Sequence, residues 1–421
     1  MKAFLVLEDG TVFVGAGIGT PKEVVSEIVF NTSMTGYLEV LTDPSYAGQA
    51  VVMTYPLIGN YGITPDMESK QPWPDAFIVR ELSRTHSNFR SEGSIQDFLL
   101  GYKIPGIAGI DTRALTKILR EKGTMNGLIA FEGNGESGRL YGRRQTDRVE
   151  KLSETDPALQ TLTAAPIGTI TKLSENENTA AVLERIAAYS VTGVVKKTTC
   201  AEKELHSVLG EANNRLQDYG TFPMEKPVFS SNPKRVALLD LGAKANITQS
   251  LQERNCEVTI YPAITKAEEI LADRPDGIML SNGPGDPSEC SDIIAEIRKL
   301  YKSDIPIFAI CLGHQLMALA TGATTHKMKY GHRGGNHPVK DLTSGRVYIS
   351  SQNHGYVVDT EKLDEAIAVP AFINVNDGTN EGLSYQGKNI FTVQFHPEAS
   401  PGPQDSAYLF DRFITMMGGN A

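Results

Sequence analysis

The second half of this 421-residue chain alternates short apolar runs with helix-like segments from residue 234 onward. The predicted strands and helices follow one another in this order: strand 236–242, helix 245–254, strand 256–261, helix 266–272, strand 277–281, helix 291–301, strand 305–310 and a helix to about 320. Strands that are separated by helices pair in parallel, because a parallel partner needs a crossover connection. With further strands near 346–350 and 391–395, the pattern predicts a doubly wound α/β domain over 234–421. Its functional centre is expected at the carboxyl ends of the strands.

The first third of the chain predicts a smaller, β-rich α+β domain. Short strand patterns separated by turn residues occur at 3–7, 11–15, 27–32 and 51–55. Asp111 is suited to cap a helix that runs through Lys122, since apolar residues recur at helical spacing and Gly123 supplies a stop. We expect this helix to pack on the sheet.

Two segments of different composition divide the chain. Residues from about 132 to 180 are polar and predict a mobile insert, whose clustered basic residues are assigned no chemistry: Arg139, Arg143, Arg144, Arg148 and Lys151. Residues 222–233 carry three prolines and predict a linker. The expected domains are therefore 1–221 and 234–421.

Composition excludes several classes of protein. The formal net charge of −10 argues against a general nucleic-acid binder, which needs a clustered positive surface. Four cysteines without a CxxC pair favour neither a disulfide framework nor a zinc ribbon, so we expect a reducing compartment and a cytoplasmic protein. No apolar stretch is long enough to cross a bilayer, and the first residues lack the apolar core of a secretion signal.

Cys311 stands at the junction of a predicted strand and a predicted helix. The strand at 305–310 is followed by Cys-Leu-Gly-His-Gln, and the helix pattern begins at residue 312 or 313. In a nucleophile elbow, such a tight turn presents one side chain above the sheet, next to a helix N-terminus that favours a thiolate and a nearby oxyanion. Cys311 is therefore a candidate nucleophile, with a buried structural cysteine as the alternative.

The segment His396-Pro397-Glu398 could supply the base that a catalytic thiol needs. Pro397 cannot donate to a β-ladder, so it should end the strand at 391–395 and leave His396 at the strand end. In an extended segment Glu398 would lie on the same side and hold the imidazole through one ring nitrogen. A Cys, His and Glu set is thus predicted, with a capping or turn role of the tripeptide as the alternative.

A glycine-rich loop, SNGPGDP at 281–287, directly follows the strand at 277–281. Without a Cβ, its backbone N–H groups can approach a ligand closely and form an oxyanion hole with the N–H of Leu312, whereas the alternative is an ordinary turn. The loop lacks the Lys-Ser/Thr ending of a phosphate-binding loop. Six of the eight histidines follow residue 310, but their spacing shows no zinc pattern, so no metal site is predicted.

Three motifs, NGPGDP at 282–287, CLGHQ at 311–315 and FHPE at 395–398, occur in one order across the C-terminal half. These motifs and their order make the C-terminal half resemble the class-I glutamine amidotransferases. Further segments narrow the resemblance to the small-chain family of carbamoyl-phosphate synthase: GGNHPVKD, SQNHGYVVD, HPEASPGP and, near the start, FNTSMTGYLEVLTDPSYAGQ. It covers nearly the whole chain except about 132–180.

The resemblance implies roles for individual residues. Cys311 would be the nucleophile, His396 the general base and later acid, and Glu398 its orienting partner. The residues implied to contact the bound L-glutamine are Ser45, Gly283, Gly285, Leu312, Gln315, Asn353, Gly355 and Tyr356. Tyr356 stands where the family often has Phe, which matters little if its backbone makes the contact.

The resemblance also implies a partner, a large synthetase chain that receives ammonia and makes carbamoyl phosphate from bicarbonate and ATP for arginine or pyrimidine biosynthesis. We expect no cofactor in this chain, with ATP and Mg²⁺ bound by the partner. Three alternatives stay open at this point: another amidotransferase or γ-glutamyl hydrolase with the same catalytic domain, a non-catalytic regulatory subunit, and, more remotely, a cysteine protease.

Overall fold

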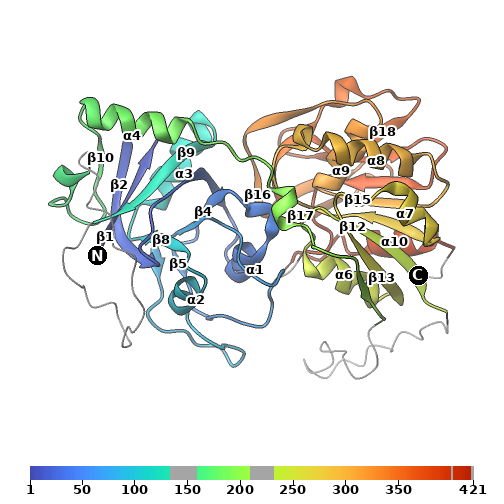
Figure 1. The fold of residues 1–421 in the computed structure, drawn as a ribbon, viewed down its shortest axis with the longest axis horizontal. Helices are drawn as coiled ribbons and strands as arrows, with labels where there is room; N and C mark the ends of the chain where they lie inside the picture. The colour runs from blue at the N-terminus through green and yellow to red at the C-terminus, as the bar shows by residue number, and fades with distance from the viewer. Residues whose placement is uncertain (133–158, 209–231, 400–401, 419–421) are drawn as a thin grey trace. The chain divides into compact units, whose positions relative to one another are not determined.

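The computed structural model describes residues 1–132, 159–208, 232–399 and 402–418 (Figure 1). The chain divides into two compact units, Met1–Thr192 and Gly193–Ala421, and each is described by itself. No helix in these described ranges is long and apolar enough to span a membrane.

The N-terminal unit is built on one closed β-sheet. Its strands are β1 (Lys2–Leu7), β2 (Thr11–Gly19), β3 (Val24–Asn31), β4 (Gln49–Met53), β6 (Ala76–Ile78), β8 (Pro105–Ala108), β9 (Met125–Phe131) and β10 (Ile170–Lys172). The sheet order is β1-β9-β3-β4-β6-β8-β2-β10, and β1 also pairs with β2, so the sheet closes on itself. Only the successive pairs from β3 to β8 run parallel. The prediction of a β-rich first domain is confirmed.

Helices and a short parallel ribbon complete this unit. They are α1 (Tyr37–Thr42), α2 (Ile95–Gly101), α3 (Thr112–Lys122), α4 (Glu177–Ala187), and the ribbon of β5 (Leu57–Ile58) and β7 (Glu81–Leu82). The predicted helix after Asp111 is confirmed as α3, since the Asp111 carboxylate accepts a hydrogen bond from the Ala114 N–H at 2.9 Å. Leu115 and Leu119 form its buried face.

The prediction of one polar insert over about 132–180 is wrong for its second part. Residues 133–158, which hold the predicted basic cluster, lie outside the described residues. After them, Leu159 is buried with Val182 and Ile186 of α4 in a core that includes residues of β1, β2 and β9, and β10 pairs with β2. The few apolar residues near 159–173 lack a clear period, which is why composition alone did not reveal this packing.

The C-terminal unit contains one mixed sheet, with helices on both of its faces. Its strands are β11 (Glu204–His206), β12 (Lys234–Asp240), β13 (Cys256–Pro262), β14 (Gly277–Leu280), β15 (Ile307–Ile310), β16 (Thr325–Asp341), β17 (Val347–Val358), β18 (Ala368–Asn374), β19 (Asn380–Tyr385) and β20 (Ile390–Val393). Their order is β11-β13-β12-β14-β15-β20-β19-β18-β16-β17. The strands from β13 to β20 in this order pair in parallel, as predicted.

The two faces of this sheet carry separate hydrophobic cores, which confirms the doubly wound architecture. The helices are α5 (Val195–Thr198), α6 (Ala245–Gln252), α7 (Ala267–Ala272), α8 (Ser291–Tyr301), α9 (Leu312–Ala320) and α10 (Tyr408–Met416). Apolar residues of α7, α8 and α9 form one core, and those of α6 and α10 form the other. Side chains of β12 alternate between the two cores, as a strand buried on both faces requires.

The predicted domain boundary at 222–233 is wrong, because the C-terminal unit begins at Gly193. The strand β11 pairs antiparallel with β13, and the Cys200 N–H donates to the Asp240 carboxylate at 2.6 Å. Residues 195–206 therefore belong to the C-terminal unit, although they precede the proline-rich segment. The predicted linker itself lies outside the described residues except for Asn232 and Pro233.

The sheet also continues as an antiparallel half, from β19 to β17, of which only a fragment near 346–350 was predicted. The strand β16 is rich in His, Gly and Lys and shows two register shifts against β17. A strand of this composition has no apolar alternation, so its sequence gives little signal.

Candidate active site

Cys311 lies in a strained turn between β15 and α9, as an elbow requires. Its backbone has φ +53° and ψ −106°, a conformation that costs a non-glycine residue on the order of 1–3 kcal/mol. The Cys311 N–H donates to the Val393 carbonyl at 2.8 Å, and this bond to β20 holds the turn. The side chain is buried, and its Sγ lies 3.7 Å from the Asn353 carbonyl oxygen.

The absence of a side chain at Gly313 lets this elbow sit against the neighbouring strand. A Cβ at Gly313 would lie 2.6 Å from the Leu280 carbonyl oxygen, and the Gly313 N–H donates to the Ser281 carbonyl at 3.0 Å. The first turn of α9 is thereby fixed to the start of the loop 281–287. The strand, the tight turn and the helix were all predicted for this segment, and the structure confirms them.

His396 and Glu398 form a buried pair, although not in the predicted extended segment. The strand β20 ends at Val393, and the His396 N–H then bridges to the Ser351 carbonyl at 2.9 Å. The chain turns at Pro397, where the Ala399 N–H donates to the His396 carbonyl at 3.2 Å. This turn brings Glu398 Oε1 within 2.7 Å of His396 Nδ1, with both side chains nearly inaccessible to solvent.

Lys244 is a member of this site that sequence reasoning missed. It follows β12 in the segment LGAK, and its Nζ lies 3.0 Å from Glu398 Oε1 although the residue is only 6% exposed. Its own N–H donates to the Asn282 side chain at 3.0 Å, which links it to the loop 281–287. A lysine directly after a buried strand was the available signal, since lysine is almost never buried without a partner.

The charges of His396, Glu398 and Lys244 shift the pKa values of the buried His396 and Glu398 pair. Burial disfavours a charge on His396, but Glu398 outweighs it, with the nearby Cys311 side chain adding to the effect, and together they raise the pKa of His396 well above its usual value. Burial opposes the Glu398 carboxylate too, yet Lys244 and His396 lower its pKa to about 2. Glu398 is therefore an anion at neutral pH and stabilises an imidazolium at His396. The His396 Nε2 is buried without a hydrogen-bond partner among the described residues, which leaves it for a reacting group.

The glycine-rich loop lies directly against the elbow. A Cβ at Gly283 would lie 2.2 Å from the Leu241 carbonyl oxygen and 2.8 Å from Leu312 Cδ2, so this position has no room for a side chain. Ser281 and Asn282 are fully buried, and the Ser281 hydroxyl accepts a hydrogen bond from the Leu241 N–H at 2.9 Å. Bare backbone beside the first residue of α9 is the arrangement that an oxyanion hole needs.

Most of the predicted glutamine contacts gather around the elbow, but their role in binding stays a prediction. Gly283, Gly285 and Leu312 belong to the loop and the helix start, and Asn353, Gly355 and Tyr356 lie on β17. Gln315 is tied to the Tyr356 carbonyl at 2.8 Å and to Gln394 Oε1 at 2.9 Å, so it joins α9 to β17. Ser45 belongs to the N-terminal unit, where its N–H donates to Asp43, and its role likewise stays a prediction.

A buried histidine cluster on the neighbouring strands offers metal-ligand atoms. His332, His354 and Glu381 each bring one donor atom to within 4.8 Å of the others, although their spacing predicted no metal site. Asp377 and Glu381 outweigh burial and raise the pKa of His332 to about 9, so at neutral pH a proton supplies the positive charge there. Both ring nitrogens of His354 are hydrogen-bonded, to the Tyr356 carbonyl and to Gln352. In this structure His354 therefore links Gln352 and Tyr356 of β17, and the absence of a metal site stays a prediction.

The arrangement is suited to nucleophilic acyl transfer. A thiol stands on a strained elbow, an imidazole lies beside it with one nitrogen held by a carboxylate, and bare backbone lies next to the helix start. The buried surroundings strengthen each of these electrostatic interactions.

Comparison with known proteins finds a matching family for each of the two units. Residues 237–416 match the family described as glutamine amidotransferase class-I, and residues 5–129 match the carbamoyl-phosphate synthase small chain, CPSase domain. The carbamoyl phosphate synthase small chain of Symbiobacterium thermophilum is 44% identical over 99% of this chain and 98% of its own length. That of Clostridium perfringens is 44% identical over 98% and 99%. A solved glutamine amidotransferase from Thermotoga maritima covers 44% of this chain and 82% of its own at 20% identity, with a TM-score of 0.34.

Proposed function

This chain belongs to the carbamoyl-phosphate synthase small-chain family, whose members are the glutamine-hydrolysing subunits of that enzyme. We propose that glutamine hydrolysis by this chain depends on Cys311, His396 and Glu398. The observation that carries the assignment is the geometry of the elbow and the pair. Cys311 is held at φ +53°, and the only nitrogen of His396 left without a partner among the described residues is Nε2, because Nδ1 is bound to Glu398 at 2.7 Å.

The thiol proton of Cys311 first passes to His396 Nε2, which gives a thiolate and an imidazolium, and the thiolate then attacks the side-chain amide carbon of L-glutamine. The carbonyl oxygen becomes an oxyanion, which backbone N–H groups at Leu312 and in the loop 281–287 stabilise. The His396 imidazolium then gives its proton to the amide nitrogen, the C–N bond breaks and ammonia leaves, with a γ-glutamyl thioester remaining on Cys311. The neutral His396 next takes a proton from water, which attacks the thioester and releases glutamate and the thiolate.

Ammonia is the useful product, and we propose that it passes to a large synthetase chain paired with this one. In this proposal the large chain binds bicarbonate, ATP and Mg²⁺ and makes carbamoyl phosphate, while the small chain needs no cofactor of its own. Support comes from the sequence, which lacks a phosphate-binding loop, and from the match of residues 5–129 to the domain particular to these small chains. A cytoplasmic location is part of the same proposal.

Two substitutions should shift the pH dependence of glutamine hydrolysis in opposite directions. The Glu398 anion raises the pKa of His396, so Glu398→Gln should lower it, and the imidazolium would be lost at lower pH. Lys244 lowers the pKa of His396, so Lys244→Met should raise it. The measurement is the rate of glutamate formation against pH in the presence of the large chain. We expect the alkaline limb to move down for Glu398→Gln and up for Lys244→Met.

The control is Lys266→Met, which removes a lysine that pairs with Glu296 at 3.0 Å and is not part of the site. Its profile should match that of the wild type. Shifts in the same direction for the two site variants would contradict the assigned charges. A wild-type chain that forms no glutamate from glutamine would overturn the proposed mechanism as a whole.

A further inference from the structure

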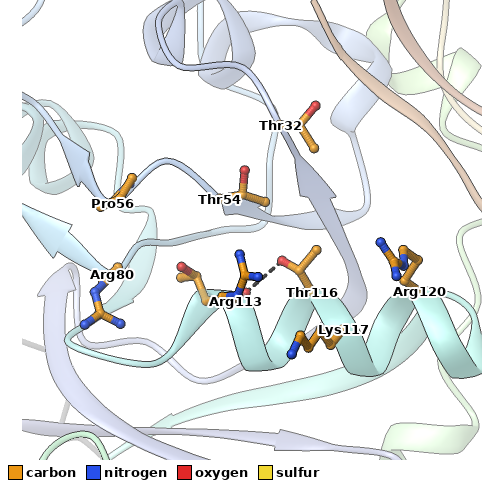
Figure 2. A pocket seen from close by; sticks show the side chains of 9 residues that line it. Thr32, Thr54, Pro56, Arg80, Arg113, Thr116, Lys117 and Arg120 are labelled. Atoms are coloured by element: carbon orange, nitrogen blue, oxygen red, sulfur yellow. Dashed lines mark hydrogen bonds between the residues drawn. The ribbon is translucent and has the colours of Figure 1, made fainter. Parts of the chain in front are cut away.

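A pocket of about 540 Å³ lies on the N-terminal unit, within that unit alone. One wall is the helix α3, and the other is formed by the ends of neighbouring strands and the segments after them. Figure 2 shows Arg113, Thr116, Lys117 and Arg120 following one another along α3, with Thr54 across the pocket and Arg80 near its end. None of these residues takes part in the proposed hydrolysis.

The pocket is strongly basic in a chain of net charge −10. Its four cations, Arg80, Arg113, Lys117 and Arg120, are exposed, and the described residues that line the pocket with them include no aspartate or glutamate. No ion pair or side-chain hydrogen bond to another described residue engages these four charged groups. Four cations that line one pocket, with no acidic group among its described lining residues, produce a local positive potential that attracts an anionic partner.

The helix α3 fixes the spacing of this charge. Leu115 and Leu119 are fully buried, so the helix is anchored by its inner face. Positions 113, 117 and 120 are four and three residues apart and therefore lie along one face of the helix, where all three side chains are exposed. At 1.5 Å per residue they extend over about 10 Å. This length exceeds a single phosphate group and suits a chain segment that carries several carboxylates, which arginine binds through paired N–H groups.

We propose that this basic pocket is a docking site for a carboxylate-bearing segment of the large synthetase chain. The proposal rests on the proposed function, which requires such a chain to receive the ammonia. A nucleic acid fits poorly, because the chain as a whole is acidic. Charge complementarity, the exposure of the four cations and their extension along the helix favour a protein segment over a compact anion.

The test is the affinity of the full-length chain for the large chain, measured at two salt concentrations. Reversing two of the charges, in the double variant Lys117→Glu and Arg120→Glu, should weaken association by about tenfold or more and reduce its salt dependence. Glutamine hydrolysis by the uncomplexed variant should equal that of the uncomplexed wild type. The matched control is Lys22→Glu with Lys103→Glu, which changes the net charge equally at exposed lysines outside the pocket and should keep wild-type affinity.

The outcomes separate the docking proposal from the proposed function. Wild-type affinity in the pocket variant would overturn the docking site and leave the hydrolytic function intact. Equal weakening in the control would also overturn it, because net charge would then explain the effect. A wild-type chain that does not associate with the large chain would overturn both the docking site and the proposed transfer of ammonia.

A second measurement addresses a compact anion and a folding defect. Inorganic pyrophosphate is added to the full-length wild type and the pocket variant, and thermal unfolding is followed. Stabilisation of the wild type alone, together with unchanged affinity of the variant for the large chain, would assign the pocket to a small anion and overturn docking.

If charge reversal impairs folding, the milder pair Lys117→Ala and Arg120→Ala should still weaken association, and wild-type affinity in this pair would contradict the proposal.

Discussion

Replacing Cys311 by serine should abolish carbamoyl phosphate synthesis from glutamine and leave synthesis from free ammonium intact in the complex with the large chain. A serine hydroxyl is a far weaker nucleophile than a thiolate, and the position is buried, so bulk water cannot easily replace it as the nucleophile. Loss of the nucleophile from a triad of this kind lowers turnover by about 1,000-fold or more. The measurement is the rate of carbamoyl phosphate formation with each nitrogen source.

Cys290→Ser is the matched control for this substitution. Cys290 is also a buried cysteine of the C-terminal unit, and burial raises the pKa of its thiol to about 11, so it is a poor nucleophile at neutral pH. The control should use both nitrogen sources like the wild type. Retained use of glutamine by Cys311→Ser would remove Cys311 from its assigned role.

Replacing Gly283 by alanine should lower the turnover of glutamine by about 100-fold or more, because the loop 281–287 would have to move. The new Cβ would lie 2.2 Å from the Leu241 carbonyl oxygen and 2.8 Å from Leu312 Cδ2, next to the first residue of α9. Displacing one oxyanion donor costs about 100- to 1,000-fold in turnover. Overpacking also costs about 1–3 kcal/mol in the free energy of unfolding.

Two measurements separate these effects, the turnover number and the free energy of unfolding by denaturant. The control Gly93→Ala adds a Cβ that meets nothing within 4 Å and should change neither quantity appreciably. Full activity in Gly283→Ala would show that the loop does not supply the oxyanion donors. If unfolding of part of the variant accounts for the whole loss of activity, the folded molecules turn glutamine over normally, and the same conclusion follows.

The parallel core of the C-terminal unit could be predicted from the sequence because its strands and helices alternate with clear periods. The helices α8 and α9 agree closely with the predicted ranges 291–301 and 312–320. The antiparallel half could not be predicted, since β16 carries polar residues and glycines on both faces. The boundary between the two units was misplaced for a related reason. The strand β11 has only three residues, and it forms because it pairs with β13, not because its own sequence has a strand pattern.

The candidate site was predictable where a motif fixed the local backbone. Cys311 follows directly from a strand, a tight turn and a glycine, and His396 and Glu398 are neighbours in the sequence. Lys244 was missed because its partner Glu398 is distant in the sequence and the two meet only through the sheet. The turn at Pro397 was considered only as the alternative to an extended segment, because a proline after a strand is compatible with either.

The central claim, that Cys311 carries the γ-glutamyl group, is tested most directly by trapping the thioester. The wild-type chain is mixed with glutamine, quenched in acid during steady turnover, digested and examined by mass spectrometry. We predict a γ-glutamyl adduct on the peptide that contains Cys311, and none on that peptide in Cys311→Ser. An adduct on Cys200, Cys256 or Cys290 instead, or hydrolysis at the wild-type rate in Cys311→Ser, would contradict the claim.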